Sequence, residues 1–191
     1  VTGTAEDVTG GRHDAGRPCC AAGVGAISRD TRGGSASRIG CVVRTRICIF
    51  LVVICVGLAY APVRHGGFLW DDDSHITANP SIVGPQGLKE IWTSAAANYF
   101  PLTTTSFWVQ HALWGLNPMP YHVVNVVMHA FCALVLCAGL RELRVPGAEL
   151  GALIWALHPV QVEFVAWICE LKNVQACLFY LLALWLFTRW L

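Results

Sequence analysis

Four apolar runs, separated by stretches that carry most of the charge, constrain this chain more than any other feature. The first reads ICIFLVVICVGLAYAPV over residues 47–63 and contains no Asp, Glu, Lys or Arg. Together with residues 41–43 it reaches about 20 residues, the length of a helix that crosses a ~30 Å hydrocarbon core. We therefore expect an all-α, polytopic membrane protein with about four transmembrane helices. The predicted spans lie at about residues 43–62, 121–140, 148–158 and 173–191.

The composition agrees with a membrane protein. Hydrophobic residues make up 55% of the chain and charged residues 13%, which is more apolar than a soluble domain of this size needs. The formal net charge of +1 is too small for the basic footprint of a nucleic-acid-binding protein. Lipid is therefore the expected environment, and nucleic acid is not an expected partner.

Both ends of the chain indicate a fragment of a larger protein. Residues 1–40 are rich in Gly, Ser, Arg and Thr without apolar periodicity, which predicts a disordered segment or upstream sequence translated in error. The first methionine is Met119, and the chain stops at Leu191 inside an apolar run. We expect residues 41–191 to form part of a larger membrane domain.

Basic residues predict how the helices are oriented, because positive charge favours the cytoplasmic side of a membrane. Those next to the ends of the first, second and fourth runs are Arg44, Arg46, Arg141, Arg144 and Arg189. The N-terminus is then cytoplasmic. The loop over residues 63–120 and the connection over 159–172 both face the periplasm, another extracytoplasmic space or the lumen of the endoplasmic reticulum.

A cleaved signal peptide is the alternative for the first run. Ala59 and Ala61 form an A-x-A pattern that a signal peptidase could cut. The long basic region in front of the run and Pro62 just after the second alanine favour a retained helix.

The long loop contains an aromatic segment, NYFPLTTTSFWVQHALWG, over residues 98–115. Phe107, Trp108 and Trp114 recur at mostly helical spacing, and Trp is enriched at membrane interfaces. Pro101 is suited to a first helical turn. We expect a short helix that begins at Pro101 and lies on the outer membrane surface.

The first candidate site is the acidic run Asp71-Asp72-Asp73 in the same loop. Adjacent carboxylates repel one another, so their affinity for protons rises unless a cation or hydrogen bonds compensate. One of them can act as a general base while another holds a divalent ion. The alternative is a solvated acidic turn without function.

The second candidate site is the sequence HPVQVE at residues 158–163. The break at Pro159 predicts that His158 and Glu163 lie near the outer membrane boundary, where ionisable groups are costly and tend to be functional. If the chain is helical from Val162, Glu163 shares one face with Trp167 and Glu170. The alternative is a turn whose polar side chains reach the interface. Lys172 is either a phosphate ligand or an anchor for the last span.

Two further sets of residues have structural interpretations. His122, Asn125 and His129 share one face of the second predicted span, where a polar seam to neighbouring helices is favoured over a metal site. Nine cysteines include five that lie inside apolar runs, where cysteine behaves as a small hydrophobe. These five are Cys48, Cys55, Cys132, Cys137 and Cys177.

Four blocks of sequence resemble the membrane half of the transmembrane and tetratricopeptide-repeat proteins, a family that includes eukaryotic O-mannosyltransferases. The blocks are FLWDDDSHITANPSI (68–82), NYFPLT (98–103), GLNPMPYHVVNVVMH (115–129) and HPVQVEFVAWICELKNVQACLFYLLAL (158–184). Two positions depart from the family pattern: Phe100 stands where relatives often carry His or Arg, and Leu171 where many carry Arg.

The resemblance implies a GT-C glycosyltransferase fold whose active site lies on the outer face of a many-helix membrane domain, with tetratricopeptide repeats downstream. Such an enzyme transfers a hexose such as mannose from a polyprenyl-phosphate carrier to a protein or glycan acceptor. Asp71 and Asp72 are the implied catalytic pair, with or without a divalent metal. The implied substrate and carrier ligands are His158, Glu163, Lys172, Asn98 and Tyr99. A fragment of this size is not expected to be active alone.

A non-catalytic membrane scaffold or a transporter component is the alternative function. Transport sites usually lie near the middle of the membrane on broken helices. The predicted spans carry almost no charge, and the carboxylates lie outside them. The sequence therefore disfavours transport more than it disfavours a scaffold.

Overall fold

The computed structural model describes residues 34–85, 87–93 and 100–191, and every regular element in these ranges is helical. This confirms the predicted all-α class. The chain divides into two units, Val1–Val42 and Val43–Leu191, and the packing below is that of the second unit.

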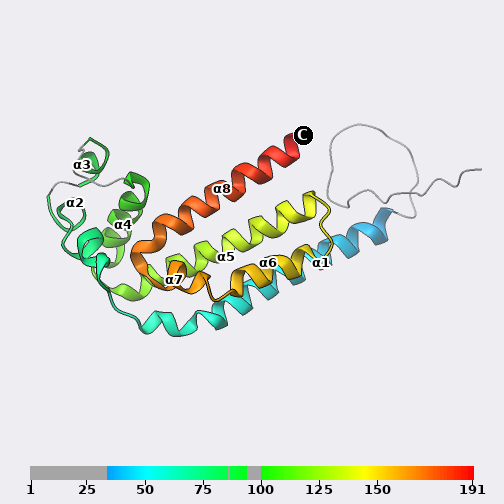
Figure 1. The fold of residues 1–191 in the computed structure, drawn as a ribbon, viewed down its shortest axis with the longest axis horizontal. Coiled ribbons are helices and arrows are strands. Elements are labelled where there is room, and N and C mark those ends of the chain that lie inside the picture. Colours follow the sequence, from blue (N-terminus) through cyan, green and yellow to red (C-terminus); the bar gives the residue numbers. More distant parts are fainter. Residues whose placement is uncertain (1–33, 86, 94–99) are drawn as a thin grey trace, which may run out of the picture. The chain divides into compact units, whose positions relative to one another are not determined.

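The elements follow one another along the chain as labelled in Figure 1. In order they are α1 (Gly34–Ala59), η1 (Ala61–His65), η2 (Asp73–Thr77), α2 (Pro80–Val83), α3 (Gly87–Thr93), α4 (Pro101–Trp114), α5 (Pro118–Glu142), α6 (Ala148–Leu157), α7 (Gln161–Ala166), η3 (Ile168–Glu170) and α8 (Leu171–Trp190).

The four predicted spans correspond to α1, α5, α6 and α8. Helix α1 begins at Gly34, so residues 34–40, which we predicted to be disordered, are helical. Helix α6 ends at Leu157 because His158 precedes a proline and takes an extended conformation (ψ 134°).

Two of these helices are long and apolar enough to cross a membrane: Pro118–Glu142 and the combined segment Ile168–Trp190. Within the described residues, Thr45–Ala59 and Ala148–Leu157 are apolar but shorter. Length and composition therefore support two crossings, and the four-span arrangement is taken up again below as a proposal.

Helix α5 is the centre of the second unit, with α8 along one side and α6 along another (Figure 1). Small side chains line its contact with α6, where the helix backbones approach closely, and side chains of α1 complete the same buried cluster. The buried members of this cluster are Cys48, Val52, Val56, Tyr60, Ala133, Cys137, Ala152, Ala156 and Val165.

A second cluster joins the 63–120 loop to the starts of α5 and α8. Its buried members are Ile76, Ile82, Phe107, Tyr121, Ile168 and Leu171. Helix α4 begins at Pro101, as predicted. Its Phe107 is only 2% exposed and lies against Tyr121, with ring centroids 6.3 Å apart. The predicted surface helix therefore packs one face on protein, while Val109 and Leu113 on its other side are exposed.

The predicted polar seam on α5 is confirmed for two of its three members, Asn125 and His129. Asn125 Nδ2 donates to the carbonyl oxygens of Trp167 (2.9 Å) and Ile168 (3.3 Å), where the chain changes direction between α7 and η3. The ring Nε2 of His129 is hydrogen-bonded to the carbonyl oxygen of Ala156 at 2.9 Å. The two Asn125 bonds are added to backbone ones, since the Trp167 carbonyl also accepts from the Glu170 amide and the Ile168 carbonyl from the Leu171 amide.

We predict that Asn125→Leu lowers the thermal stability of the detergent-solubilised protein. Asn125 is fully buried and donates to two carbonyls, and each such hydrogen bond contributes about 0.5–1.5 kcal/mol net. Val127→Leu, at a half-exposed position of the same helix, should change stability by no more than about 0.5 kcal/mol. Equal melting temperatures for the two variants would show that the seam does not stabilise the bend.

Candidate active site

The acidic run does not form a uniform acidic turn, because its members have different surroundings. Asp72 is fully buried, whereas Asp71 and Asp73 are exposed. Asp72 Oδ2 accepts from the Leu69 amide at 2.8 Å, and Oδ1 accepts from the Cys169 amide at 2.7 Å. One carboxyl group thus ties the loop to the chain just before α8, 97 residues away.

Burial raises the pKa of the Asp72 carboxyl above its ordinary value. The two amide hydrogen bonds and the neighbouring His122 oppose this shift, because each favours the charged form. The net direction means that water is more effective than this pocket at stabilising the Asp72 carboxylate.

Trp70 and Trp167 also connect the turn that contains Asp72 to the chain before α8. Trp167 Nε1 donates to the Leu69 carbonyl oxygen at 3.2 Å. The rings of Trp70 and Trp167 meet edge to face, with centroids 5.7 Å apart. Trp70 has φ 46°, a left-handed conformation that is unfavourable for an aromatic residue. Contacts on both sides of Trp70 hold this conformation and fix the direction in which Asp71 leaves the turn.

A charged cluster lies beside Asp71 at the start of α8. Lys172 Nζ forms an ion pair with Glu170 Oε1 at 2.8 Å, and Asn173 Nδ2 donates to the other oxygen of the same carboxylate. The Asp71 carboxylate also interacts electrostatically with Lys172. Lys172 Nζ lies 5.9 Å from the centre of the Phe100 ring. The structure thus places Asp71 within electrostatic range of Lys172 and gives the lysine Glu170 as its ion-pair partner.

Hydrogen bonds pin α4 to α8 next to this cluster. Thr103 Oγ1 donates to Gln175 Oε1, and Gln175 Nε2 donates to Ser106 Oγ, both at 2.7 Å. Thr103 and Gln175 are buried. Phe100, directly before α4, is thereby held over Lys172.

His122 lies under the loop as a further polar group. It is 3% exposed, and among the described residues neither ring nitrogen has a hydrogen-bond partner. A Cβ atom at Gly66 would lie 2.9 Å from its Nε2. The glycine therefore makes room for this imidazole at the point where the chain leaves η1. The sequence assigned His122 to the polar seam and did not indicate its nearness to Asp72.

The other predicted site residues do not join the cluster. His158 and Glu163 are exposed, and within the described ranges neither forms a hydrogen bond or ion pair with the side chain of Asp71, Asp72 or Lys172. His158 Nδ1 instead accepts from the Val160 amide at 3.2 Å.

The predicted shared helix face of Glu163, Trp167 and Glu170 is wrong. Helix α7 ends at Ala166, and Trp167 is extended with ψ 125°. The physical reason is that the carbonyls of this break bond to the α5 side chain Asn125 instead of continuing a helix. Asn98 and Tyr99 lie outside the described residues.

The acidic run does not fit a preformed divalent-metal site. Both oxygens of Asp72 already accept amide hydrogens, so this carboxylate has little capacity left for a cation. Within the described ranges, no three His, Cys, Asp or Glu side chains are grouped as metal ligands.

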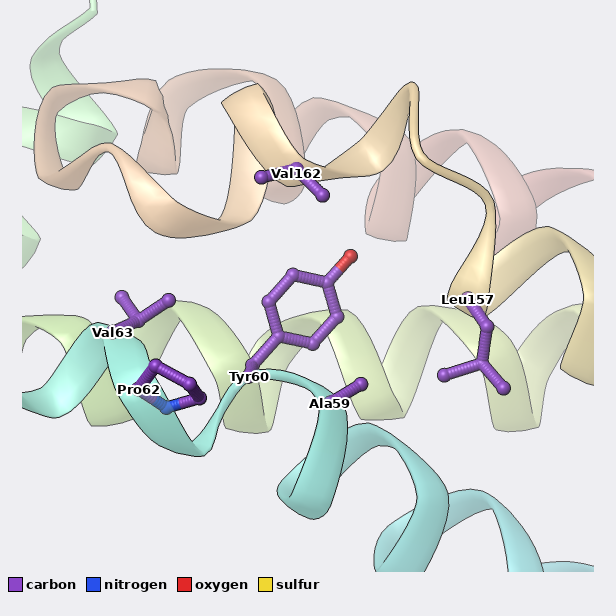
Figure 2. A pocket seen from close by; sticks show the side chains of 6 residues that line it. All are labelled: Ala59, Tyr60, Pro62, Val63, Leu157 and Val162. Carbon is purple, nitrogen blue, oxygen red and sulfur yellow. The ribbon is translucent and has the colours of Figure 1, made fainter.

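An apolar pocket lies between the end of α1 and the start of α7, away from the charged cluster. Its volume is roughly 260 Å³, and its lining residues are Ala59, Tyr60, Pro62, Val63, Leu157 and Val162. Figure 2 shows the Tyr60 ring standing in the middle of it. The Tyr60 hydroxyl donates to the Ala156 carbonyl oxygen at 3.5 Å, a long contact that leaves one wall of the pocket polar.

Comparison with known proteins gives relatives of one kind. Protein O-mannosyl-transferase TMTC2 of Homo sapiens is 32% identical over 148 residues, which are 70% of this chain and 18% of that protein. Protein O-mannosyl-transferase TMTC1 of Homo sapiens is 29% identical over 183 residues, 85% of this chain and 21% of that protein. The resemblance to the transmembrane and tetratricopeptide-repeat family is confirmed.

The relationship also reaches invertebrates, since Protein O-mannosyl-transferase Tmtc1 of Drosophila melanogaster is 30% identical over 146 residues, 68% of this chain and 17% of that protein. This chain spans about a fifth of the length of the curated relatives it matches. No family model matches it, and no solved structure matches it.

We predict that Asp72→Asn destabilises the protein by about 1–3 kcal/mol, because the amide NH₂ group cannot accept one of the two backbone hydrogens. Asp73→Asn is the matched control, since Asp73 is exposed and only bonds the Thr77 hydroxyl. Thermal unfolding in detergent measures both. Equal stability of the two variants would contradict the structural role of Asp72.

The loss of unfolding free energy caused by Asp72→Asn should depend on pH. A raised folded-state pKa means that the native protein binds this proton more tightly than the unfolded chain. The contribution of Asp72 to stability is therefore complete below the ordinary carboxyl pKa of about 3.9 and falls as the pH rises through the raised value. The stability difference between wild type and Asp72→Asn should shrink over this range. A difference that grows with pH would mean that the folded-state pKa of Asp72 is lowered, which would contradict our prediction.

Proposed function

We propose that this chain is the site-bearing membrane part of a GT-C glycosyltransferase that moves a hexose, by analogy with its relatives mannose, from a polyprenyl-phosphate carrier to a protein acceptor. The observation that carries the proposal is the pair of hydrogen bonds that Asp72 accepts from the Leu69 and Cys169 amides. It joins the turn that carries the exposed Asp71 to the chain just before Lys172, whose ammonium lies within electrostatic range of the Asp71 carboxylate.

In this proposal the two adjacent aspartates have different tasks. Asp71 is the catalytic carboxylate, because its exposure lets it reach the hydroxyl of an acceptor. It removes the hydroxyl proton as the oxygen attacks the sugar carbon that carries the phosphate. Asp72 is a positioning residue, because both of its oxygens are occupied by amides and it is fully buried.

Lys172 receives the phosphate that leaves. Its ion pair with Glu170 restrains the ammonium in one position, with the Phe100 ring on another side. A phosphate that approaches the lysine adds negative charge where positive charge is already fixed, which stabilises the leaving group as its charge develops. Glu170 reduces the attraction of Lys172 for phosphate, because it neutralises part of the lysine charge.

The proposed topology has four crossings, by α1, α5, α6 and α8, with the N-terminus in the cytoplasm. The cluster of Asp71, Glu170 and Lys172 then lies on the extracytoplasmic or lumenal side. Arg141 and Glu149 lie at the opposite ends of α5 and α6 and form a 2.8 Å ion pair, which suits the cytoplasmic boundary.

A non-catalytic scaffold is the second candidate, and one observation favours it. The only ammonium in the described cluster, that of Lys172, is already paired with Glu170, so the site offers a carrier phosphate less positive charge than a free lysine would. The experiment below separates the two functions.

We predict that Asp71→Asn in the full-length protein lowers the rate of mannose transfer from a polyprenyl-phosphate donor by at least about a hundredfold, the usual effect of removing a general base. The melting temperature of the variant should equal that of the wild type, because Asp71 is exposed. Asp73→Asn, the other exposed aspartate, should keep its activity. Normal transfer by Asp71→Asn, or no transfer by the wild type, would favour the scaffold.

A further inference from the structure

Two buried thiols from distant parts of the sequence meet between α1 and α5. Cys48 Sγ and Cys137 Sγ lie 3.3 Å apart, and 89 residues separate them in the chain. Their side chains are 5% and 2% exposed. We propose that Cys48 and Cys137 form an oxidation site, a dithiol that closes to a disulfide between the two helices.

The geometry is close to what this reaction needs. A disulfide bond is about 2.0 Å long, so the two sulfurs have to approach by only about 1.3 Å. Rotation about the Cα–Cβ bonds with a small shift of either helix supplies this movement. Ala133 of α5 and Ala152 of α6 lie in the same buried cluster as the two thiols.

The other thiols of the bundle provide an internal comparison. Cys132 of α5 interacts with Cys177 of α8, but its thiol donates to the Val174 carbonyl oxygen at 3.6 Å. Cys55 of α1 is half-buried and, within the described residues, makes no hydrogen bond to another thiol. The sulfur atoms of Cys48 and Cys137 lie 3.3 Å apart, and Cys132 and Cys177 are a second pair of neighbouring thiols.

A charged cluster one helical turn away gives this pair access to polar reagents. Arg141, four residues after Cys137, donates to Thr45 Oγ1 at 3.2 Å, and Thr45 lies three residues before Cys48. The guanidinium is also paired with Glu149, and these two side chains are 27% and 24% exposed. Water therefore reaches within a turn of the thiols. Arg141 and Glu149 place opposite charges beside the Cys137 thiol, and the thiolate is the form that starts the oxidation.

The oxidant in this proposal is an organic hydroperoxide, a class that peroxidised membrane lipids supply. One thiolate attacks the O–O bond, which breaks to give a sulfenic acid and an alcohol. The second sulfur then attacks the sulfenic sulfur, the S–S bond forms, and water leaves with the remaining proton. The two cysteines together lose two electrons and two hydrogens, and the hydroperoxide is reduced to alcohol and water.

The disulfide would close a loop that contains the whole 63–120 segment, including Asp71 and Asp72. Cross-links of long loops stabilise folded proteins chiefly by restricting the unfolded chain. The oxidised protein should therefore unfold at a higher temperature than the reduced protein. The proposal is independent of glycosyl transfer, since it requires no substrate and no catalytic residue.

The test uses the full-length protein in membrane vesicles, treated with cumene hydroperoxide and then with N-ethylmaleimide. Trypsin can cut between the two cysteines at Arg64 or Lys89, both in the loop. Mass spectrometry of the non-reduced digest should identify one cross-linked peptide pair that contains Cys48 and Cys137 and that dithiothreitol separates. Recovery of both cysteines as N-ethylmaleimide adducts after oxidation would overturn the proposal.

Matched variants check the assignment. Cys48→Ser and Cys137→Ser should each abolish the cross-link, whereas Cys55→Ser and Cys132→Ser should retain it. A cross-link that persists in Cys48→Ser would come from another pair and would overturn the proposal. The wild-type digest needs no substitution, so a variant that fails to fold does not prevent a decision.

Discussion

The carboxyl group of Asp72 accepts hydrogen bonds from two backbone amides that lie in distant parts of the chain. An isolated carboxylate is costly to bury, and only specific donors make its burial tolerable. The Leu69 amide fixes the local turn, and the Cys169 amide fixes that turn to the start of α8. The positions of Asp71, Trp70 and Lys172 relative to one another all depend on this connection.

Helix α5 contacts the chain segment that carries the Cys169 amide, and so it supports the Asp72 hydrogen bonds. Its polar face bonds carbonyls at the ends of α6 and α7, which adds side-chain hydrogen bonds to the bend between Leu157 and Leu171. Its small residues allow α6 to approach closely, and side chains of α1 complete the same buried cluster. The bend between Leu157 and Leu171 brings Cys169 to the acidic loop. The Cys169 amide thereby becomes part of the candidate site.

Much of the fold follows from local sequence patterns. The apolar runs predicted α1, α5, α6 and α8, and the proline rules predicted the start of α4 at Pro101 and the end of α6 before Pro159. The spacing of His122, Asn125 and His129 predicted a polar face, because helical periodicity is a local property. The helical segment 34–40 was missed because its Gly and Ser residues are poor helix formers on their own.

The site was harder to predict because it depends on contacts between distant residues. Three adjacent aspartates look equivalent in sequence, and only tertiary packing makes Asp72 buried and leaves Asp71 exposed. The helix expected from Val162 to Glu170 breaks at Trp167 because Asn125, on another helix, competes for its carbonyls. Lys172 was identified as a candidate, but its pairing with Glu170 two residues earlier was not.

Amide hydrogen exchange tests the central role of Asp72 most directly. Wild type and Asp72→Ala, which lacks both acceptor oxygens, would be compared in lipid nanodiscs by mass spectrometry on peptides that cover residues 64–76 and 166–172. Our account predicts that both segments lose protection together in the variant, because one carboxyl group binds the Leu69 and Cys169 amides. Loss of protection confined to residues 64–76, with residues 166–172 exchanging as in the wild type, would contradict it.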